Sequence, residues 1–435
     1  MTTAARPPAG TAGRAPSAAP RSGTLPLVLF ASTLTVMAGS ILAPVVQVIR
    51  EDLALSGTAA GLIVTAHSLA IAVASPLAGW MLDRWGLRLP LAAGLVVYGL
   101  AGATGLVTED YAALIAGRMV FGVGAALVFT GTTLALLNLY QGSDRERAMG
   151  WRSTATSLGG VLWPLLAGAV GGISWHLPFG VYLLGLPLGV ATLFLLPGGS
   201  PAGEGGPAER IGTMTLLRRH RVLLVWYALQ FSASLLLYAL LLFLPQRLSE
   251  TGVDDPLLVS LYTVGMSATM SVIGLFYAPL GARLGRLALL RGALALWAAA
   301  FLLLAVAPSA PLLFLAPVLF GLGQGVFFPV TTVLIGEEVP VAVRGKATAL
   351  SGTAAFAGQF ASPLLVGPLI QATSPTTGFL VATALPVLAL AAVWRVRAED
   401  TRPADAAGDA DGGPGAAAAT RATPSTQATP AAPTP

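Results

Sequence analysis

The stretch RERAMGWRSTATSLGGVLWPLLAG, residues 145–168, returns 199 residues later as RGKATALSGTAAFAGQFASPLLVG, residues 344–367. Nine of the 24 aligned positions are identical, whereas a chain this rich in Ala, Leu and Gly would give about 2 or 3 by chance on composition grounds. The same offset aligns Gln47 with Gln246 and Arg84 with Arg283 without a gap. One offset kept from near the start of the chain to residue 367 indicates an internal repeat.

Apolar segments of about 20 residues recur around these stretches, which is the length a helix needs to cross a bilayer core of about 30 Å. The composition agrees, because 55% of the residues are hydrophobic and only 10% are charged. Lipid offers no water to unpaired backbone groups, so such segments must be helical. The sequence therefore predicts twelve spans, at residues 26–48, 58–82, 89–107, 111–139, 149–172, 177–196, 222–245, 257–281, 287–307, 311–335, 347–371 and 376–395.

The spans fall into two sets of six. We expect an N-terminal six-helix bundle over residues 25–196 and a C-terminal one over residues 222–397, joined by a flexible cytoplasmic linker at 197–221. The Ala- and Pro-rich ends, residues 1–24 and 398–435, are predicted to be disordered tails. Because six spans separate the two copies, they have the same orientation in the membrane. Parallel repeats of this kind place a solute site between the halves near mid-depth.

The positive residues predict the orientation. With the N-terminus inside, the outer loops hold only Arg50 and Arg247, and Arg118 lies within a span, which leaves 21 of the 24 Lys and Arg residues on the cytoplasmic side. This excess follows the positive-inside rule, so we expect both termini in the cytoplasm. Lys346 is the only lysine, a bias typical of GC-rich bacterial genomes. We therefore expect a multi-pass protein of the bacterial inner membrane.

Several classes of site are excluded by what the sequence lacks. There is no cysteine, and His67, His176 and His220 show no metal-ligand spacing. No phosphate-binding GxxxxGK[ST] loop and no GxSxG or other catalytic constellation occurs. The net charge of +5 reflects how arginines are placed around the membrane. We therefore expect no enzyme activity, no cofactor, no metal, no ATP and no nucleic acid, and a chain that works as a monomer.

A charged turn follows span 2, where Gly79-Trp80-Met81-Leu82-Asp83-Arg84-Trp85-Gly86-Leu87-Arg88 is found. This pattern resembles motif A of the major facilitator superfamily, and the resemblance as a whole covers about residues 25–397. It implies the major facilitator fold and a conformational latch formed by Gly79, Asp83, Arg84, Gly86 and Arg88, which holds the two bundles together at the cytoplasmic side when the carrier faces outward. The alternative is an ordinary charged turn that maintains topology. In the second half Ala282 takes the place of the aspartate.

An arginine lies about two turns inside span 4, in Arg118-Met119-Val120-Phe121-Gly122-Val123-Gly124. This segment resembles motif B of the superfamily, and the resemblance implies a part for Arg118 in proton or solute coupling. Charge at that depth usually faces a bundle interior. The alternatives are that it snorkels to the outer interface or bonds to carbonyl groups. His67 is the only mid-span group that titrates near neutral pH, so it is a second coupling candidate; a histidine with a satisfied local bond is the other interpretation.

Span 5 contains Gly159-Gly160-Val161-Leu162-Trp163-Pro164-Leu165-Leu166-Ala167-Gly168, which resembles motif C of drug:proton antiporters. Trp163 and Ala167 stand where that motif has glycine. A proline kink and a small-residue face remain, as a closely packed gate helix requires. The gate-helix residues are Gly159, Trp163, Pro164, Gly168 and, in the second copy, Pro363. A general packing motif shared by spans 5 and 11 is the alternative.

No acidic residue lies mid-span, so neutral, amphipathic or anionic solutes fit better than strongly cationic ones. The spans that line the pathway in this superfamily supply the cavity candidates, whose shared feature is an aromatic or amide side chain: Gln47, Asn138, Trp226, Tyr227, Gln230, Tyr238, Tyr262, Gln324 and Gln359. Helix packing is the alternative role for any one of them.

The resemblance implies a secondary active transporter that works by alternating access. We expect proton-coupled export of drug-like, amphipathic or secondary-metabolite small molecules, with protons and the lipid bilayer as its other partners. A proton-coupled uptake permease for a metabolite or an organic anion is the alternative function. A receptor or scaffold that does not transport is a third class, with less support because no folded signalling domain is evident.

Overall fold

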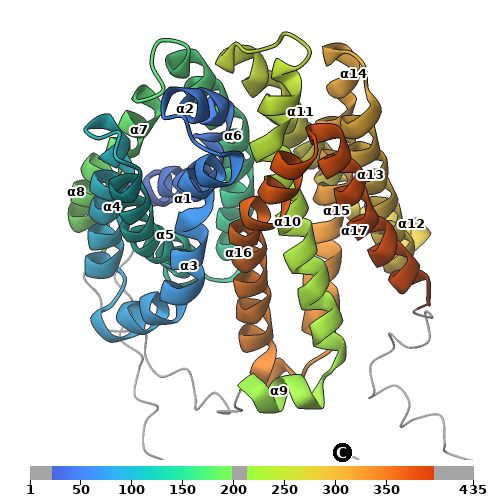
Figure 1. Cartoon of the computed structure of the whole chain (residues 1–435). Helices are drawn as coiled ribbons and strands as arrows, with labels where there is room; N and C mark the ends of the chain where they lie inside the picture. Colours follow the sequence, from blue (N-terminus) through green and yellow to red (C-terminus); the bar gives the residue numbers. More distant parts are fainter. Residues whose placement is uncertain (1–21, 198–212, 396–435) are drawn as a thin grey trace, which may run out of the picture. The chain divides into compact units, whose positions relative to one another are not determined.

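The computed structural model describes residues 22–197 and 213–395, and within these ranges every regular element is helical (Figure 1). The first range holds α1 (Thr24–Ser40), η1 (Ala43–Val45), α2 (Val46–Asp52), α3 (Gly57–Trp85), α4 (Arg88–Gly102), η2 (Ala103–Leu106), α5 (Tyr111–Leu139), α6 (Gly142–Gly171), α7 (Leu177–Val181), η3 (Tyr182–Leu184) and α8 (Gly185–Leu195). The second holds α9 (Thr213–Arg219), α10 (Val222–Ser249), α11 (Pro256–Leu275), α12 (Tyr277–Leu284), α13 (Arg286–Val306), α14 (Ala310–Leu313), α15 (Leu315–Glu337), α16 (Val341–Ala372) and α17 (Pro375–Arg395).

Twelve helical segments within the described ranges are long and apolar enough to cross a membrane. Four of them combine consecutive helices: α1 to α2, α4 with η2, α7 to α8, and α14 with α15. The predicted all-α chain of twelve spans is confirmed. The predicted tails lie almost wholly outside the described residues, as does most of the predicted linker; its last part forms α9, in which Leu216 is buried. The bundle boundaries stay a prediction.

The internal repeat extends to the helix ends. Ser56 and Asp255, which are 199 residues apart, each accept a hydrogen bond from the backbone N–H three residues later and so cap α3 and α11. Gly86 and Gly285, the same distance apart, join α3 to α4 and α12 to α13 with φ of 74° and 78°. Only glycine adopts this conformation without strain. The two halves therefore begin and end corresponding helices with the same devices.

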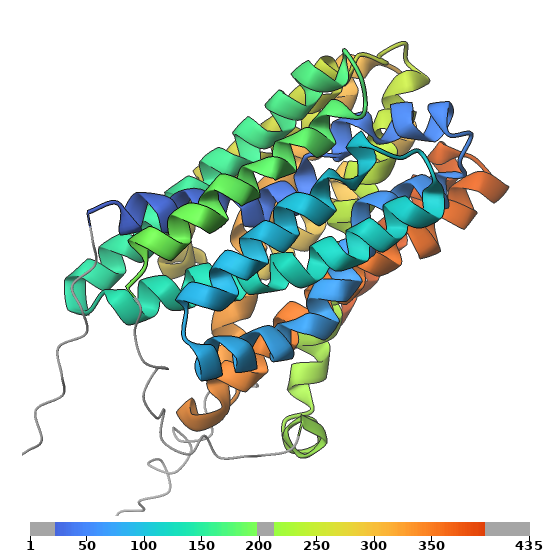
Figure 2. The ribbon, with the colours of Figure 1, turned by 90° about the vertical axis from the view of Figure 1, so that its left-hand side faces the viewer.

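Helix packing repeats in the same way. In the first half α5 packs against α3 and α4, and in the second half α15 packs against α11 and α13. Figure 2 looks at the first half, where the helices of residues 57–195 lie in front. Most contacts between the halves come from two helix pairs, α3 with α16 and α6 with α11. Spans 2 and 5 of the first half thus pack against spans 11 and 8 of the second. We call the interface formed by these two helix pairs, together with the contact between α1 and α10, the seam.

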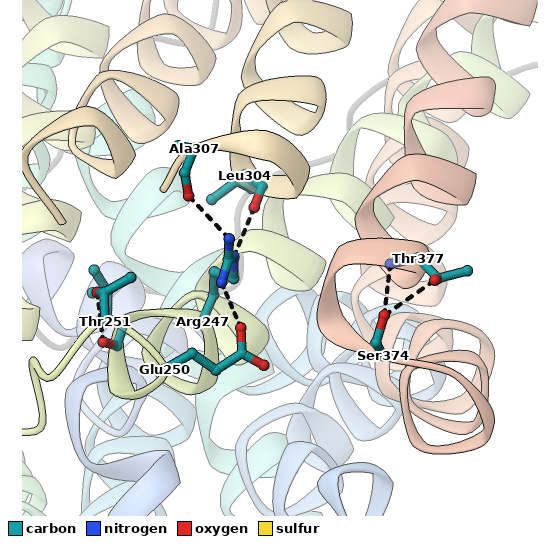
Figure 3. A network of polar contacts seen from close by, with 8 residues as sticks. Arg247, Glu250, Thr251, Leu304, Ala307, Ser374 and Thr377 are labelled. Carbon is teal, nitrogen blue, oxygen red and sulfur yellow. Dashed lines mark hydrogen bonds and ion pairs between the residues drawn. The ribbon is translucent and has the colours of Figure 1, made fainter. Parts of the chain in front are cut away.

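An arginine ties together two helix ends at the predicted outer side of the second half (Figure 3). Arg247, near the end of α10, donates hydrogen bonds to the carbonyl oxygens of Leu304 and Ala307 at 3.1 and 3.0 Å and pairs with Glu250. The last carbonyls of a helix have no partner within it, and a cation there is stabilising. Arg247, one of the two arginines that the predicted orientation places on the outer side, therefore caps the end of α13.

Candidate functional site

The buried centre of the first half is Arg118. Its side chain is 1% exposed, and its guanidinium donates to the hydroxyl of Tyr182 at 3.1 Å and to the carbonyl oxygens of Ala38 and Val64 at 2.9 and 3.3 Å. These partners come from α1, α3 and η3. A charge in a dry interior needs such partners. Arg118 therefore points into the bundle and bonds to carbonyls; it does not snorkel to the interface.

His67 lies directly beside Arg118. Its Nδ1 atom is 3.0 Å from Nη2 of Arg118 and 2.7 Å from the carbonyl oxygen of Val64. A neutral imidazole has one N–H, so Nδ1 either donates to Val64 or accepts from Arg118, but it cannot do both. The two predicted coupling candidates are thus one unit, and the histidine has two competing tautomers. We call this unit the Arg118–His67 pair.

Aromatic rings surround the pair. The guanidinium lies 4.3 Å from the ring centre of Phe121, which contacts Tyr98 at 4.5 Å and Tyr182 at 4.8 Å between centroids. Tyr98 also donates to the carbonyl oxygen of Leu34 at 2.7 Å. The cation is stabilised by ring faces as well as by hydrogen bonds. Sequence reasoning missed Tyr98 and Tyr182, because nothing in their local sequence separates them from ordinary interior aromatics.

Glycines set the helix spacing around the pair, and they do so in both halves. A Cβ atom on Gly122 would lie 2.5 Å from the carbonyl oxygen of His67, and one on Gly321 would overlap that of Met266. A Cβ atom on Gly124 would lie 2.6 Å from the backbone nitrogen of Tyr98, and one on Gly323 would lie 2.6 Å from the ring nitrogen of Trp297. Every partner is shifted by 199 residues. The motif B glycines are therefore shared packing positions, whereas Arg118 is replaced by Pro317 in the second half.

The seam is adjacent in sequence to the Arg118–His67 pair at two places. Gly39, next to Ala38, packs against the hydroxyl of Tyr238 on α10. Ser68, next to His67, donates to Oε1 of Gln359 on α16 at 2.8 Å. The second half thus contacts α1 and α3, two of the helices that surround Arg118, one residue away from Ala38 and His67.

The seam is tight toward the predicted outer end and loose toward the inner one. Gly61 lies against Pro363, Gly168 against Pro256 and Ser260, and Gly367 against Thr58. At the opposite end, Cβ atoms added to Gly79, Gly150, Gly345 or Gly352 would meet nothing within 4 Å. Within the described ranges, these seam contacts lie in the predicted outer and middle parts of the spans.

The motif A residues lie at that open end. Gly79, Asp83 and Arg84 belong to the last turns of α3, Gly86 ends that helix and Arg88 begins α4. Asp83 and Arg84 are exposed, and no ion pair of Asp83 occurs within residues 22–197 and 213–395. Arg84 instead lies 5.9 Å from the ring centre of Trp80. The predicted latch residues are together at this turn, but within the described ranges Asp83 forms no ion pair with the other half.

The gate-helix residues divide between two surroundings. Trp163 is 7% exposed and donates its ring N–H to the carbonyl oxygen of Thr33 at 3.1 Å, while Gly159 packs between them. Trp163 therefore ties α6 to α1 where the related motif has glycine. Pro164 and Pro363 lie inside α6 and α16. Gly168 and Pro363, as described above, lie on the seam.

The cavity candidates are not all in one place. Tyr227 and Tyr262 use their hydroxyls on the carbonyl oxygens of Ala347 and Ala310, both at 2.9 Å. Gln47 contacts Glu51 and Arg50 near the outer end of span 1, Asn138 is exposed at the end of α5, and Trp226 is buried in α10 near its start. Of the remaining four candidates, Tyr238 and Gln359 contact the first half, at Gly39 and Ser68. Gln230 accepts a hydrogen bond from Thr331 within the second half, and Gln324 is buried on α15.

Two kinds of known proteins resemble this chain. "Multidrug resistance protein 1" of Bacillus subtilis (strain 168) is 28% identical over 156 residues, 36% of this chain and 40% of the relative. "Quinolone resistance protein NorA" of Staphylococcus aureus (strain Mu50 / ATCC 700699) is 26% identical over 153 residues, 35% of this chain and 39% of the relative. The chain thus matches about two-fifths of the length of these relatives.

Solved structures resemble it over a longer range. A D-xylose–proton symporter matches with a TM-score of 0.69 and 18% identity, covering 87% of this chain and 98% of the symporter. A bacterial homologue of the human lysosomal transporter Spinster, inward-facing and occupied, matches with a TM-score of 0.71 and 15% identity, covering 86% of this chain and 97% of that one. At these identities the likeness shows the fold.

A family model settles the relationship. The model described as "Major Facilitator Superfamily" matches residues 28–275 and again residues 248–430, so together the matches cover most of the chain. The twelve spans and the fold agree with it. The chain is therefore a multi-pass membrane protein that belongs to the major facilitator superfamily, a family of secondary transporters and not of enzymes.

Proposed function

We propose that this chain exports drug-like, amphipathic or secondary-metabolite small molecules in exchange for protons, by alternating access, across the bacterial inner membrane. The observation that carries the proposal is the contact between His67 and Arg118 at 3.0 Å, a titratable ring beside a buried cation. The resemblance to relatives named for multidrug and quinolone resistance supports the export direction.

Proton binding at His67 changes the hydrogen bonds that hold Arg118. A protonated imidazole carries N–H on both nitrogens, so Nδ1 becomes a donor to Val64 and can no longer accept from Arg118. Two cations then face each other in a dry site, which is unfavourable. Arg118 consequently relies on Ala38 and Tyr182, and the balance between α1 and α3 changes.

That change reaches the seam through adjacent residues. Ala38 is followed by Gly39, which packs against the hydroxyl of Tyr238. His67 is followed by Ser68, which donates a hydrogen bond to Gln359. A small shift of α1 against α3 therefore alters two contacts between the halves at once. Packed interfaces switch between discrete arrangements because they do not deform continuously. We propose this as the route from proton to conformation.

The seam contacts support an inward-facing state, because they lie toward the predicted outer end while Cβ atoms added to the glycines at the other end would meet nothing. In the outward-facing state the motif A latch closes: Asp83 leaves solvent and contacts the second half. The bundles proposed to move are residues 25–196 and 222–397, with both termini and the linker 197–221 in the cytoplasm and the chain acting as a monomer.

Reconstituted liposomes test this function. Purified protein is given an imposed pH gradient and a panel of neutral, anionic and cationic compounds, and we expect gradient-dependent flux of neutral or weakly charged amphipaths. No gradient-dependent flux across the panel would falsify proton-coupled export. Cells that lack the gene and lose uptake of one nutrient, with unchanged tolerance to the compounds, would establish the uptake alternative.

A further inference from the structure

Gln324 is a buried amide without a hydrogen-bond partner. Its side chain is 7% exposed, and its Oε1 atom is buried with no partner in the described part of the chain. Buried polar atoms in proteins are nearly always paired, and an exception calls for an explanation. Gln371, by contrast, an amide near the end of α16, bonds to Thr58. The unpaired amide oxygen of Gln324 therefore reflects the surroundings of residue 324 and is not a general property of the amides in this chain.

Packing does not require an amide there. The residue aligned with Gln324 in the first half is Ala125, which is 4% exposed on α5. Gly323, which aligns with Gly124, packs against Trp297, and Gly325, which aligns with Ala126, packs against Met270. These contacts fix α15 against α13 and α11 whatever residue 324 is. In the first half a small apolar residue occupies the aligned, buried position.

The amide faces α10 and the seam. Thr331 donates to Oε1 of Gln230 on α10 at 3.3 Å, and Gln324 lies seven residues earlier on the same face of α15. Because α10 and α15 run in opposite directions, two turns back along α15 from Thr331 corresponds to two turns forward along α10 from Gln230. Gln324 is therefore at about the level of Tyr238. Tyr238 reaches Gly39 of the first half. Gln324 therefore lies beside the place where the two halves meet.

The surface that α15 presents beside this amide is apolar and aromatic, with Phe328, one turn further along the helix, 53% exposed. Between the two halves, Phe129 contacts Phe356 at 6.0 Å between ring centroids. No carboxylate lies mid-span, and the Arg118 guanidinium is already held by protein oxygens. A neutral acceptor beside such a surface suits an uncharged donor on an apolar body.

We propose, on the basis of the proposed function, that Oε1 of Gln324 accepts a hydrogen bond from an uncharged hydroxyl or N–H group of the transported molecule, and so selects neutral donor-bearing aromatics over their alkylated analogues. Gln230 and Gln359 already use their Oε1 atoms on Thr331 and Ser68. Gln324 is thus the amide in this group whose acceptor is left for the solute.

Two biphenyl probes isolate this hydrogen bond. 4-Phenylphenol and 4-methoxybiphenyl differ only in the methyl group that replaces the hydroxyl hydrogen. Equilibrium dialysis measures their binding to the full chain in lipid nanodiscs, with empty nanodiscs subtracted. We expect the wild type to prefer the phenol about 5- to 10-fold, the range of one hydrogen bond in a buried site.

Two variants carry the test. Gln324→Leu keeps the volume and removes the amide, so the preference should fall to about 1 while affinity for the ether stays within about twofold. Gln371→Leu, the control, should keep the preference. Gln324→Glu places a carboxylate at the same point and should raise the affinity for the 4-phenylbenzylamine cation at least about tenfold.

The proposal is overturned if the wild type binds neither probe or does not separate them, or if Gln324→Leu keeps the preference. The result for Gln324 does not depend on whether transport is coupled to protons. Gradient-driven flux of the compound panel without an effect of Gln324 removes only this site, whereas selective binding without any gradient-driven flux supports the site and removes only the proposed antiport.

Discussion

The hydroxyl of Tyr238 on α10 rests on the backbone of Gly39 on α1, so closely that a methyl group at residue 39 would overlap it. Tyr238 is 6% exposed. The next residue back, Ala38, holds Arg118 through its carbonyl oxygen at 2.9 Å. The residue that contacts the second half, Gly39, thus directly follows Ala38, the residue whose carbonyl oxygen binds the buried Arg118.

Gly39→Ala should hold the outer end open and reduce transport about tenfold, because overpacking a tight contact costs about 1–3 kcal/mol. The sequence has no cysteine, so Ser260→Cys, a fully buried seam position, can report opening by its rate of maleimide labelling from outside. We expect labelling to rise in Gly39→Ala and to return toward the parent rate when Tyr238→Phe is added. Gly150→Ala is the matched control, since its Cβ meets nothing. Unchanged labelling in Gly39→Ala would show that this contact does not close the outer end.

His67→Gln should separate coupling from transport. Glutamine keeps a hydrogen-bonding side chain but cannot take a proton near neutral pH, so uphill movement driven by a pH gradient should fall at least about tenfold. Exchange of substrate across liposomes at equal pH should change less than about threefold. His176→Gln, which alters a histidine that bonds to the carbonyl oxygen of Gly105, is the control. If His67→Gln keeps gradient-driven transport, the proton acceptor is elsewhere.

Asp83→Asn should impair transport while leaving membrane insertion and the thermal stability of the purified protein unchanged to within about 1 °C. The reason is that Asp83 is exposed here and its ion pair, on the latch hypothesis, forms only in the opposite state. Asp144→Asn, at another exposed aspartate near the start of α6, should retain transport. Normal flux through Asp83→Asn would remove the latch role.

Gly122→Ala should destabilise the first half by about 1–3 kcal/mol. The added Cβ would lie 2.5 Å from the carbonyl oxygen of His67 and 2.6 Å from Cβ of Ala70, and neither is a flexible group. Thermal aggregation in detergent measures the loss. Gly79→Ala, whose Cβ meets nothing, should melt as the parent does, and equal melting of the two variants would contradict the close approach of α3 and α5.

Much of the fold follows from the sequence because its determinants are local. Hydropathy gives all twelve spans, with most ends within four residues, and a fixed offset of 199 residues gives the repeat, since both are properties of linear order. The largest differences are at the start of span 5, which begins at Gly142, and at the end of span 8, which ends at Leu275. The end of the predicted linker differs: Thr213–Arg219 is helical because Leu216 finds a buried position there. Such burial depends on neighbours from other spans.

The site is less predictable for the same reason. Arg118 and His67 are each conspicuous in the sequence, but their contact depends on the rotation of two helices about their axes, which packing at Gly122 decides. Tyr182 enters the site from a 3-10 turn 64 residues away. The unmet acceptor of Gln324 has no sequence signal at all, because it is defined by what surrounds it.

The glycine contacts around α5 and α15 also have an evolutionary consequence. They describe the ancestor of this chain as a single six-helix unit whose backbone packing has been inherited twice, while the side chains at its centre have diverged. Where the first half has His67, Arg118 and Tyr182, the second half has Met266, Pro317 and Val381. Met266 is buried but Val381 is 51% exposed, so the second half has lost both the ionisable groups and part of their enclosure. Placing His, Arg and Tyr at these three positions of the second half would test whether the same helix packing can hold a second ionisable cluster.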